Sequence, residues 1–353
     1  MRKAGTPRRI FAIVVGYKSR QLLEPCLNAL ANQTRRPDGI IFVNNAAEDG
    51  CSEWVNAHFP TVHVLNAPGN IGYAGGNNFG IHHALGMNAD VVFLLNPDVV
   101  LTQTCLEILE NAMGNDIGFA QPVLEYPDGK VQSAGNLIHY LGFGCSGHSM
   151  STARPGNRLK VSYCSGAALW LDAQALAKTG LFEEALFMYH EDLELGLRAQ
   201  LANIPSWCVM EARAIHHHSR AGRFGKKFAI MEGNRWFVWI AYHGMFGITI
   251  LFPFFLLAEV AIFLQSIRQR WFFDKIQAML QLPGRISDIR KLRKKLLRFH
   301  PSPGNAILPL LCDHLDFPQP ESTTEACANA VSRRLFPFAK RLLQVFSGVS
   351  AHR

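Results

Sequence analysis

The chain has 353 residues and a net charge of +8, with 48% hydrophobic and 18% charged residues. This hydrophobic content excludes a disordered chain, and the length suits one α/β domain of about 200–250 residues with an appendage. The eight cysteines form no Cys-x-x-Cys pair, which argues against a disulfide framework or a zinc ribbon and favours a reducing compartment.

Short apolar runs alternate with helical patterns in the first part of the chain. In chain order they predict a strand at 10–17, a helix at 22–31, a strand at 39–45, a helix at 51–58, a strand at 62–66, a helix near 74–85 and a strand at 91–95. Strands that alternate with helices pair in parallel, so the pattern predicts a doubly wound, mostly parallel α/β sheet with a Rossmann-like nucleotide-binding half. The first apolar run is too short for a secretory segment, and we interpret it as the first strand of a cytosolic domain.

After an irregular middle, four further elements are expected: a strand at 164–171, a helix from about residue 172, a helix at 191–202 and a short strand at 207–210. The chain beyond them is basic. Residues 1–215 carry 15 basic and 19 acidic side chains, whereas residues 216–353 carry 20 and 8. Because long apolar runs accompany these basic residues, a membrane surface is favoured as the partner over nucleic acid.

Residues 236–264 are the most apolar stretch, and about 20 apolar residues suffice to cross a bilayer. Ten Lys or Arg follow at 268–298, and the positive-inside tendency would keep them cytoplasmic, on the same side as a cytosolic catalytic part. We therefore expect an interfacial or re-entrant pair of helices, kinked at Pro253, at the cytoplasmic face of the cell membrane. A single transmembrane span and a buried core helix of a soluble protein are the alternatives.

These patterns divide the chain into three expected regions. Residues 1–235 form the catalytic domain, residues 236–299 an apolar and basic helical region associated with the membrane, and residues 300–353 a Pro-rich linker with a basic amphipathic tail.

An aspartate follows the predicted strand at 91–95. A carboxylate just past the carboxyl end of a parallel strand lies where open α/β sheets bind their ligands. Asp98 is therefore placed to hold a hard divalent cation, which beside a nucleotide usually contacts phosphate oxygens. The sequence Asn96-Pro97-Asp98 can equally be a turn with side-chain-to-backbone hydrogen bonds.

Eight segments, taken together and in order, resemble the inverting family 2 glycosyltransferases with the GT-A fold, especially the rhamnosyltransferase-like branch. They are VVGYKS (14–19), FVNNAAEDG (42–50), NAPGNIGYAGGNNFGI (66–81), FLLNPDVVL (93–101), PDGKVQSAG (127–135), SGAALWL (165–171), FMYHEDLELGLR (187–198) and AIHHHS (214–219). The resemblance covers about residues 9–240 and implies that fold and a nucleotide-sugar donor.

The resemblance implies a donor site built from strand ends and a glycine-rich loop, with the residues Tyr17, Asn44, Asn45, Gly72, Asn78, Asn96 and Asp98. The family most often has an aspartate at position 44, which accepts the N3–H of uracil or thymine. Asn44 can still accept that proton through Oδ1. Lys18 is a second departure from the family pattern and places a cation near the nucleotide edge. Asparagines that close a turn and glycines that pack a helix on the sheet are the structural alternatives.

By the same resemblance Asp98 corresponds to the last acid of the family's Asp-x-Asp motif, and Asn96 is its orienting or ribose-contacting neighbour. One carboxylate holds Mg²⁺ or Mn²⁺ poorly, so a second protein ligand is needed besides diphosphate oxygens and water. His216 is the best positional match and His217 the second choice. Neighbours on a strand point to opposite faces, so residues 216–218 cannot all face one ion.

Glu191 and Asp192 open the predicted helix at 191–202, where acids commonly stabilise the helix dipole. In the family pattern Asp192 matches the catalytic base, and Glu191 is the alternative base or orients the acceptor. Inverting transfer needs a carboxylate that removes the acceptor proton while the metal neutralises the diphosphate. Ser165 and Gly166 resemble the acceptor-side loop. Residues 219–227 resemble a mobile lid whose arginines could reach the diphosphate.

The resemblance thus implies a metal-dependent inverting hexosyltransferase. It would move a sugar, rhamnose favoured, from a dTDP- or UDP-sugar to a glycan acceptor such as a polyprenyl-linked saccharide in cell-surface polysaccharide synthesis. A sugar nucleotidyltransferase would need a Gly-rich, basic signature after the first strand, and residues 15–25 hold one glycine. A catalytically silent scaffold is the other alternative; Asn44 and Lys18 favour it, whereas the retained Asp98 and Asp192 argue against it.

Overall fold

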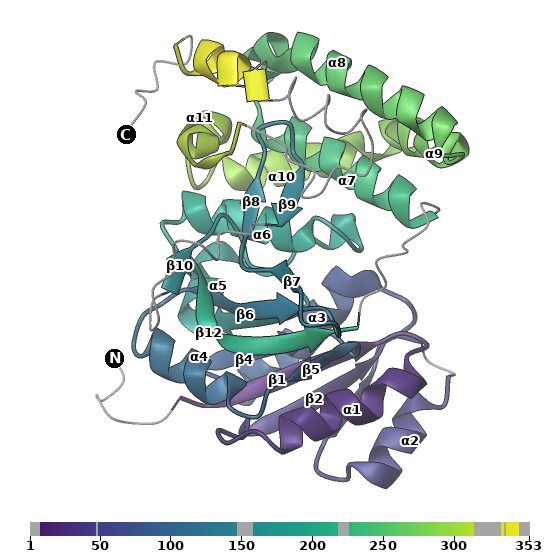
Figure 1. Cartoon of the computed structure of the whole chain (residues 1–353), viewed down its shortest axis with the longest axis vertical. Coiled ribbons are helices and arrows are strands. Elements are labelled where there is room, and N and C mark those ends of the chain that lie inside the picture. Colours follow the sequence, from purple (N-terminus) through teal and green to yellow (C-terminus); the bar gives the residue numbers. More distant parts are fainter. Residues whose placement is uncertain are drawn as a thin grey trace. The chain divides into compact units, whose positions relative to one another are not determined.

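The computed structural model describes residues 8–46, 49–146, 158–217, 226–313, 333–334 and 337–345 (Figure 1). The chain forms two compact units. Unit 1 comprises Met1–Asn136 and Ser146–Arg220, and unit 2 comprises Leu137–Cys145 and Ala221–Arg353. The expected domain boundaries at residues 235 and 299 stay predictions.

Unit 1 is built on a ten-stranded sheet. Its strands are β1 (Ile10–Gly16), β2 (Gly39–Asn44), β3 (His63–Asn66), β4 (Val91–Leu95), β5 (Val99–Leu101), β6 (Phe119–Glu125), β7 (Val131–Ser133), β10 (Arg158–Lys160), β11 (Ala168–Asp172) and β12 (Ser206–His216). The order is β10-β12-β6-β11-β4-β1-β2-β3, with β5 paired to β12 and β7 to β6. Strands β4, β1, β2 and β3 are parallel, and β11 inserts antiparallel between β4 and β6.

Helices pack on both faces of this sheet. They are α1 (Arg20–Ala31), α2 (Cys51–His58), α3 (Gly72–Gly86), α4 (Cys105–Met113), α5 (Ala173–Thr179) and α6 (Glu191–Leu201), with the 3₁₀ helix η2 (Glu184–Leu186). Alternate residues of β1 join different cores. Ala12 packs with residues of α1, α2 and α4, whereas Ile13 packs with residues of α3, α5 and α6. A strand buried on both faces reads as a continuous apolar run, and the predicted doubly wound sheet is confirmed.

The main difference from the predicted elements in unit 1 is the last strand. Residues 207–210 were expected to form a short strand, but β12 extends from Ser206 to His216. Its pairing with β6 shifts register between Val209 and Arg213, and its end pairs with β5. The polar side chains of Glu211 and Arg213 interrupt the apolar pattern that marks a strand, and tertiary pairing overrides that local signal.

Unit 2 is mostly helical. It contains α7 (Lys226–Tyr242), α8 (Met245–Arg268), α9 (Phe272–Gln281), η3 (Pro283–Arg285), α10 (Ile286–Leu296), α11 (Pro303–Ile307) and η4 (Leu308–Leu310), together with most of the hairpin β8 (Asn136–Ile138) and β9 (Gly144–Ser146). Residues 337–345 of the predicted tail are helical, and its other residues beyond 334 lie outside the described chain.

The apolar stretch at 236–264 spans two helices, but the break lies at His243 and Gly244 rather than at Pro253. Gly244 has an extended backbone and precedes the first residue of α8, which then runs through Pro253. A proline inside a helix removes one backbone hydrogen bond without necessarily ending the helix. By length and composition α8 is the one helix among the described residues that could cross a membrane.

Candidate active site

The carboxyl ends of the parallel strands align at one edge of the sheet in unit 1. Gly16 pairs with Asn44, Asn44 with Asn66, and Val14 with Leu95. The exposed side chain of Tyr17 follows directly after β1. The residues predicted at the donor edge, on β1, β2 and β4, therefore come from adjacent strand ends, where ligands of open α/β sheets bind.

Asn44 is buried and closes the turn after β2. Its Oδ1 accepts the backbone N–H of Ala46 at 3.0 Å, and its Nδ2 donates to Ser52 Oγ at 3.0 Å and to Asp49 Oδ1 at 3.2 Å. Asp49 also accepts the backbone N–H of Lys18 at 3.0 Å. A carboxylate thus lies beside Asn44 at the predicted nucleotide edge, a residue whose role the sequence reasoning missed.

Asn45 and Gly72 hold the start of α3. Asn45 donates to the carbonyl of Gly72 at 2.9 Å and accepts the N–H of Ile71 at 3.1 Å. Gly72 has a φ of 76°, and a Cβ there would lie 2.4 Å from the carbonyl oxygen of Phe187. Gly72 is therefore required for the close approach of α3 to the segment that precedes α6.

Asn78 is used within the fold. Its amide donates to the carbonyl of Phe182 at 3.0 Å and to Glu184 Oε1 at 2.9 Å, and its Oδ1 accepts the N–H of Phe182 at 3.0 Å. These bonds join α3 to residues 182–184. The donor contact predicted for Asn78 stays a prediction, and its observed contacts are structural.

Asp98 and His216 come together at the end of β12. Asp98 Oδ1 lies 3.3 Å from His216 Nε2, and the Nδ1 of His216 lies 2.7 Å from Gln132 Oε1. His217 donates its backbone N–H to the carbonyl of Asp98 at 2.8 Å, while its side chain is exposed. Of the two predicted histidines, His216 therefore contacts the Asp98 carboxylate through its side chain. His218 lies outside the described residues.

Gln132 orients His216. Oε1 of Gln132 accepts the Nδ1–H of His216, and this hydrogen bond turns Nε2 toward Asp98. A metal-ligating histidine typically donates its other N–H to such an acceptor. The described residues contain no group of three His, Cys, Asp or Glu that could hold a metal. A cation between Asp98 and His216 would therefore need further oxygen ligands, which a diphosphate offers.

Glu191 and Asp192, which we call the acid pair, lie in the first turn of α6. Asp192 accepts the N–H of Gly166 through Oδ2 at 2.9 Å and that of Leu193 through Oδ1 at 2.8 Å. The carbonyl of Gly166 accepts the hydroxyl of Tyr73 at 2.6 Å. The predicted acceptor-side glycine thus lies between the predicted base and a tyrosine that the sequence reasoning missed.

The loop that contains Gly166 also joins the acids to the strand end. The carbonyl of Ala167 accepts the N–H of Asn96 at 2.9 Å, two residues before Asp98. Ser165 donates its N–H to Gln121 Oε1 at 2.7 Å, and its Oγ accepts the N–H of Ala167 at 3.3 Å. Ser165 therefore shapes this loop through its own hydrogen bonds.

Burial sets the charge of the acid pair. Burial raises the pKa of Glu191 well above its usual range, and neighbouring Asp192 raises that pKa further. Burial also raises the pKa of Asp192, but the N–H groups of Gly166 and Leu193 oppose that rise. Glu191 Oε2 is buried and has no hydrogen-bond partner in the described chain. Glu191 is therefore the stronger holder of a proton, and Asp192 is the ionised partner.

Tyr73 lies near the acid pair, since Gly166 bonds both the Tyr73 hydroxyl and Asp192. Burial raises the pKa of the Tyr73 hydroxyl, and the neighbouring carboxyl groups of Glu191, Asp192 and Asp98 raise that pKa further. The phenol thus lies in the field of the acid pair and of the predicted metal ligand together. A group of acids with raised pKa values at a sheet edge is a candidate catalytic centre.

The segment before α6 is strained. Phe187, Tyr189 and His190 have φ angles of 60°, 66° and 68°, which non-glycine residues rarely adopt. Such strain persists where the surrounding structure fixes it, and it clusters at functional sites. The buried Arg198 provides one anchor, since it pairs with Glu194 at 2.7 Å, as the i, i+4 spacing predicts, and donates to the carbonyl of Thr179 at 2.8 Å.

Comparison with known proteins identifies the family. Residues 11–173 match the family described as Glycosyl transferase family 2. Over these residues, a little under half of its length, the chain is similar to the family 2 glycosyltransferases. The match ends before the acid pair and before His216. The fold brings these later residues to the edge of the sheet that the matched segment forms.

Two curated relatives and one solved structure are similar to this glycosyltransferase. It is 28% identical over 233 residues to an N-acetylglucosaminyl-diphospho-decaprenol L-rhamnosyltransferase of Mycobacterium tuberculosis, across 59% of this chain and 76% of the relative. It is 26% identical to the low-salt glycan biosynthesis hexosyltransferase Agl10 of Haloferax volcanii, across 58% of this chain and 66% of the relative. The structure of GalNAc-T7 with UDP, GalNAc and Mn²⁺ superimposes with a TM-score of 0.52 at 12% identity.

That superposition covers 61% of this chain and 44% of GalNAc-T7, so the chain spans less than half of that structure. The likeness concerns the fold. Together with the sheet order of unit 1, it confirms the predicted GT-A architecture of the family 2 glycosyltransferase.

Proposed function

We propose that this glycosyltransferase inverts the anomeric carbon as it moves a sugar from a nucleoside diphosphate to a hydroxyl of a glycan. The observation that carries the proposal is the convergence of Asp98, His216 and Asp192 around the loop at Gly166 and the hydroxyl of Tyr73. A scaffold without activity would not require an oriented histidine and a buried acid pair at one edge of the sheet.

The donor diphosphate would bind beside Asp98 and His216. The Asp98 carboxylate and the Nε2 lone pair of His216, which Gln132 fixes, fit a divalent cation that takes its remaining ligands from oxygen. Such a cation, Mn²⁺ or Mg²⁺, would neutralise charge on the leaving diphosphate. Tyr17, Asn44 and Asn96 would contact base and ribose, whereas Asn45, Gly72 and Asn78 would position the loop at α3.

Asp192 would act as the general base. The acceptor hydroxyl loses its proton to Asp192, its oxygen forms a bond to the anomeric carbon, and the bond from that carbon to the diphosphate oxygen breaks. Attack from the face opposite the leaving group inverts the configuration. A raised pKa makes the Asp192 carboxylate a stronger base than an ordinary aspartate, and protonated Glu191 would donate a hydrogen bond that orients the acceptor.

The donor and acceptor follow from the relatives. A curated relative is named for transfer of L-rhamnose to a decaprenol-linked saccharide, which supports a dTDP-sugar, rhamnose favoured, and a polyprenyl-linked acceptor; a UDP-sugar is the other donor. The apolar helix α8 and the basic second part of the chain support work at the cytoplasmic face of the membrane. There the chain would take part in cell-surface polysaccharide synthesis.

Calorimetric binding of dTDP, UDP and GDP, with and without Mn²⁺, tests the donor site. We expect Mn²⁺-dependent binding of dTDP or UDP by the wild type and its loss in Asp98→Ala. Asp192→Asn should keep that binding and lose transfer. If a folded chain binds none of the three diphosphates in the presence of metal, the transferase proposal fails and the scaffold alternative gains.

A further inference from the structure

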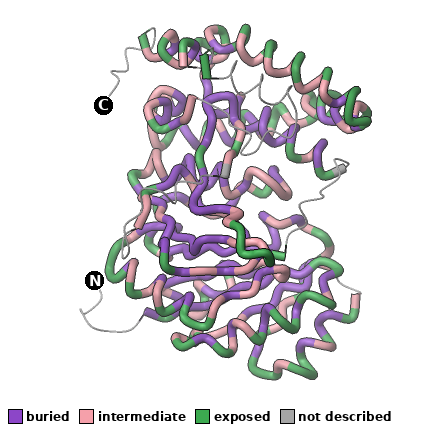
Figure 2. Tube along the Cα trace, viewed as in Figure 1, coloured by how far each residue is buried: buried purple, intermediate pink, exposed green. Residues whose placement is uncertain are grey.

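Helix α8 in unit 2 presents a continuous apolar stripe. Along 24 residues, about 36 Å of helix, the exposed side chains recur every three or four positions (Figure 2). We define the α8 stripe as the exposed apolar residues Met245, Phe246, Phe252, Pro253, Leu256, Leu257, Val260, Ala261, Leu264 and Ile267. Surface helices of soluble proteins carry polar residues on that face, and large exposed apolar patches mark interaction sites.

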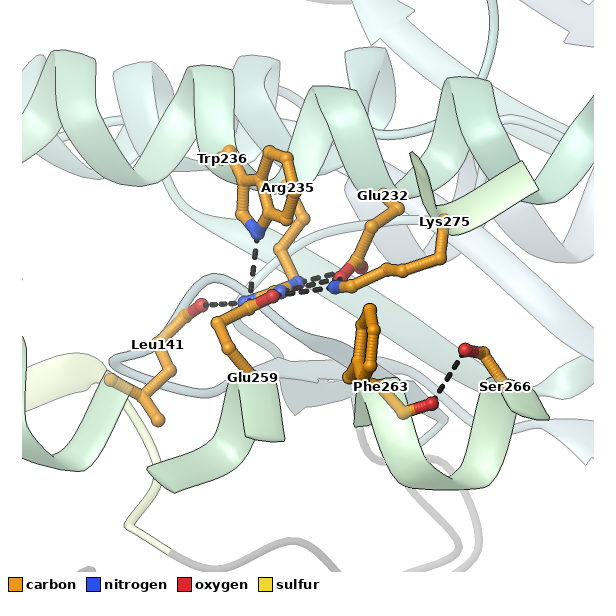
Figure 3. Close-up of polar contacts among 8 residues, drawn as sticks. All are labelled: Leu141, Glu232, Arg235, Trp236, Glu259, Phe263, Ser266 and Lys275. Carbon is orange, nitrogen blue, oxygen red and sulfur yellow. Dashed lines mark hydrogen bonds and ion pairs between the residues drawn. The ribbon is translucent and has the colours of Figure 1, made fainter. Parts of the chain in front are cut away.

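Two polar residues of α8, Glu259 and Ser266, face inward instead. Glu259 accepts hydrogen bonds from Arg235 and Trp236 of α7 and from Lys275 of α9, the Trp236 bond at 3.0 Å (Figure 3). Ser266 is fully buried, and its hydroxyl donates to the carbonyl of Phe263 at 2.6 Å. Along most of its length the helix is therefore inverted relative to a water-facing one, since the Glu259 carboxylate lies inside and large apolar side chains lie outside.

Glu259 belongs to a balanced ionic cluster, which we call the Glu259 cluster: Glu232, Arg235, Glu259 and Lys275. Arg235 pairs with Glu232 at 2.7 Å, and Lys275 pairs with both carboxylates. Burial alone would raise the pKa of Glu232, but Arg235 and Lys275 lower it to about 2. The ion pairs between two acids and two bases therefore balance one another in the interior and fix α8 against α7 and α9.

This cluster decides how α8 can meet a membrane. If α8 left α7 and α9 to cross a bilayer alone, Glu259 would enter the hydrocarbon, and Arg235 and Lys275 would lose a partner in a buried site. Such a helix keeps its inner face on the protein and offers only its stripe to lipid. At a membrane, such a helix would lie along the surface, with its axis near the headgroup boundary.

Charge complementarity identifies the surface. The exposed face of α8 has no acid, and its carboxyl end carries the exposed Arg268, followed by exposed Arg270. Helix α9 adds Phe273 and Leu280, which are 83% and 75% exposed and seven residues apart, on the same helical face. Arginines beside apolar side chains insert their stems and bind anionic headgroups.

We propose that the α8 stripe inserts into the headgroup–acyl boundary of an anionic lipid bilayer and lies along it, and that the Glu259 cluster keeps the stripe turned toward the lipid. The proposal rests on the proposed function for its membrane setting and names the surface that makes contact. It also predicts that one leaflet receives the helix and that the opposite leaflet is not reached.

Flotation of the full chain with vesicles tests the surface. Wild type should float with phosphatidylcholine vesicles containing phosphatidylglycerol, and less with phosphatidylcholine alone. The triple variant Leu256→Gln, Val260→Gln and Leu264→Gln should bind on the order of 100-fold more weakly, because three exposed side chains no longer transfer into lipid. The matched control Leu22→Gln, Phe79→Gln and Leu137→Gln changes three exposed apolar residues outside α8 and should bind as the wild type does.

Diphosphate binding is measured on the same samples. A triple variant that binds dTDP or UDP as the wild type does, yet no longer floats, supports the proposal. Unchanged flotation of the triple variant overturns it. The proposal is also overturned if the wild type is a dimer that does not float with vesicles and the triple variant is a monomer. A second copy of the chain would then cover the stripe. Loss of diphosphate binding in the wild type itself would instead refute the proposed transferase function.

The orientation of α8 relative to the membrane is measured separately. A fluorescent amino acid introduced by codon suppression at position 246, 256 or 267 reports depth through quenchers placed shallow or deep in the lipid. A helix along the surface gives the same shallow depth at all three positions. A depth that passes through the bilayer centre from 246 to 267 overturns the surface orientation and establishes a span.

Discussion

Asp98 Oδ1 lies 3.3 Å from His216 Nε2, although the two residues belong to segments far apart in the chain. Strand β5 begins directly after Asp98, and its pairing with the end of β12, Val99 opposite His216, produces this contact. The backbone thus fixes the pair before any ligand binds. Catalytic groups held by sheet pairing need little reorganisation when charge develops in the transition state.

Gln132 should control metal affinity through His216. In Gln132→Leu the Nδ1–H loses its acceptor, so the imidazole can rotate or change tautomer, and Mn²⁺ affinity of the nucleotide complex should fall about 10- to 100-fold. Calorimetric titration of Mn²⁺ in the presence of saturating dTDP or UDP measures this. Gln281→Leu, on the exposed end of α9, is the control. Equal affinities in Gln132→Leu and wild type would mean that this hydrogen bond does not orient a ligand.

The two acids should have different roles, with Asp192 as the base and Glu191 as its neutral partner. Asp192→Asn should lower the transfer rate by about 10³-fold or more, whereas Glu191→Gln should retain it within about tenfold, because the amide mimics a carboxyl that is already protonated. The wild-type rate should rise with pH as Asp192 loses its proton, with a midpoint above the usual aspartate range. A pH–rate profile of the three proteins checks this, and a larger loss in Glu191→Gln than in Asp192→Asn would reverse the assignment.

Gly72 should be far less tolerant of a side chain than Gly86 in the same helix. Gly72→Ala places a Cβ 2.4 Å from the Phe187 carbonyl at a φ of 76°, and should cost about 2 kcal/mol or more in the free energy of unfolding. Gly86→Ala has open space and should be neutral or stabilise by up to about 1 kcal/mol. Urea denaturation of both variants measures the difference, and equal stabilities would contradict the close approach.

His243 should make stability depend on pH in a defined window. Burial lowers its pKa from 6.5 to about 4, although its hydrogen bond to the Tyr140 carbonyl at 3.0 Å opposes this, and Arg293 lowers it further. The unfolded chain therefore binds the proton first, so the contribution is complete above pH 6.5 and is lost as pH falls toward 4. The wild type should lose about 3 kcal/mol there relative to His243→Asn.

Unfolding of the two proteins at several pH values gives that difference. His58→Asn, at the exposed end of α2, should follow the wild type throughout. A difference between wild type and His243→Asn that stays constant from pH 7 to pH 4 would show that His243 is not the group that titrates.

The sequence predicted the first half of the sheet because β1, β2 and β4 are apolar runs buried on both faces, a local pattern. By the family pattern it also paired Asp98 with His216, whose side chains lie 3.3 Å apart, while the roles of these residues stay predictions. It could not reveal Gln132 or Tyr73, whose roles arise from contacts between distant segments. The length of β12 was missed for the same reason, since pairing with β6 and β5 extends it past the polar residues Glu211 and Arg213.

The helix break in unit 2 shows how a strong local signal can mislead. Proline was expected to mark the kink between two apolar helices, but Gly244 separates the two helices and Pro253 lies within the second. Glu259 is an acid within the apolar stretch, and its partners on α7 and α9 make it an anchor. The sequence gives the charge of a residue, but it does not give the partner that neutralises that charge.

The Glu259 cluster should be strongly coupled. Glu259→Gln and Lys275→Gln each leave an excess buried charge and should destabilise the chain by about 3–5 kcal/mol. The double variant removes one charge of each sign and keeps the Glu232–Arg235 pair, so its loss should be smaller than the sum by about 1–3 kcal/mol. The exposed pair Asp288–Lys291, with side chains 39% and 78% exposed, is the matched control cycle and should give less than about 1 kcal/mol. Chemical denaturation of the full chain in detergent micelles measures both cycles. A coupling in the cluster no larger than in the control would mean that ions do not hold α8 in place, and packing alone would then have to explain its inward-facing charge.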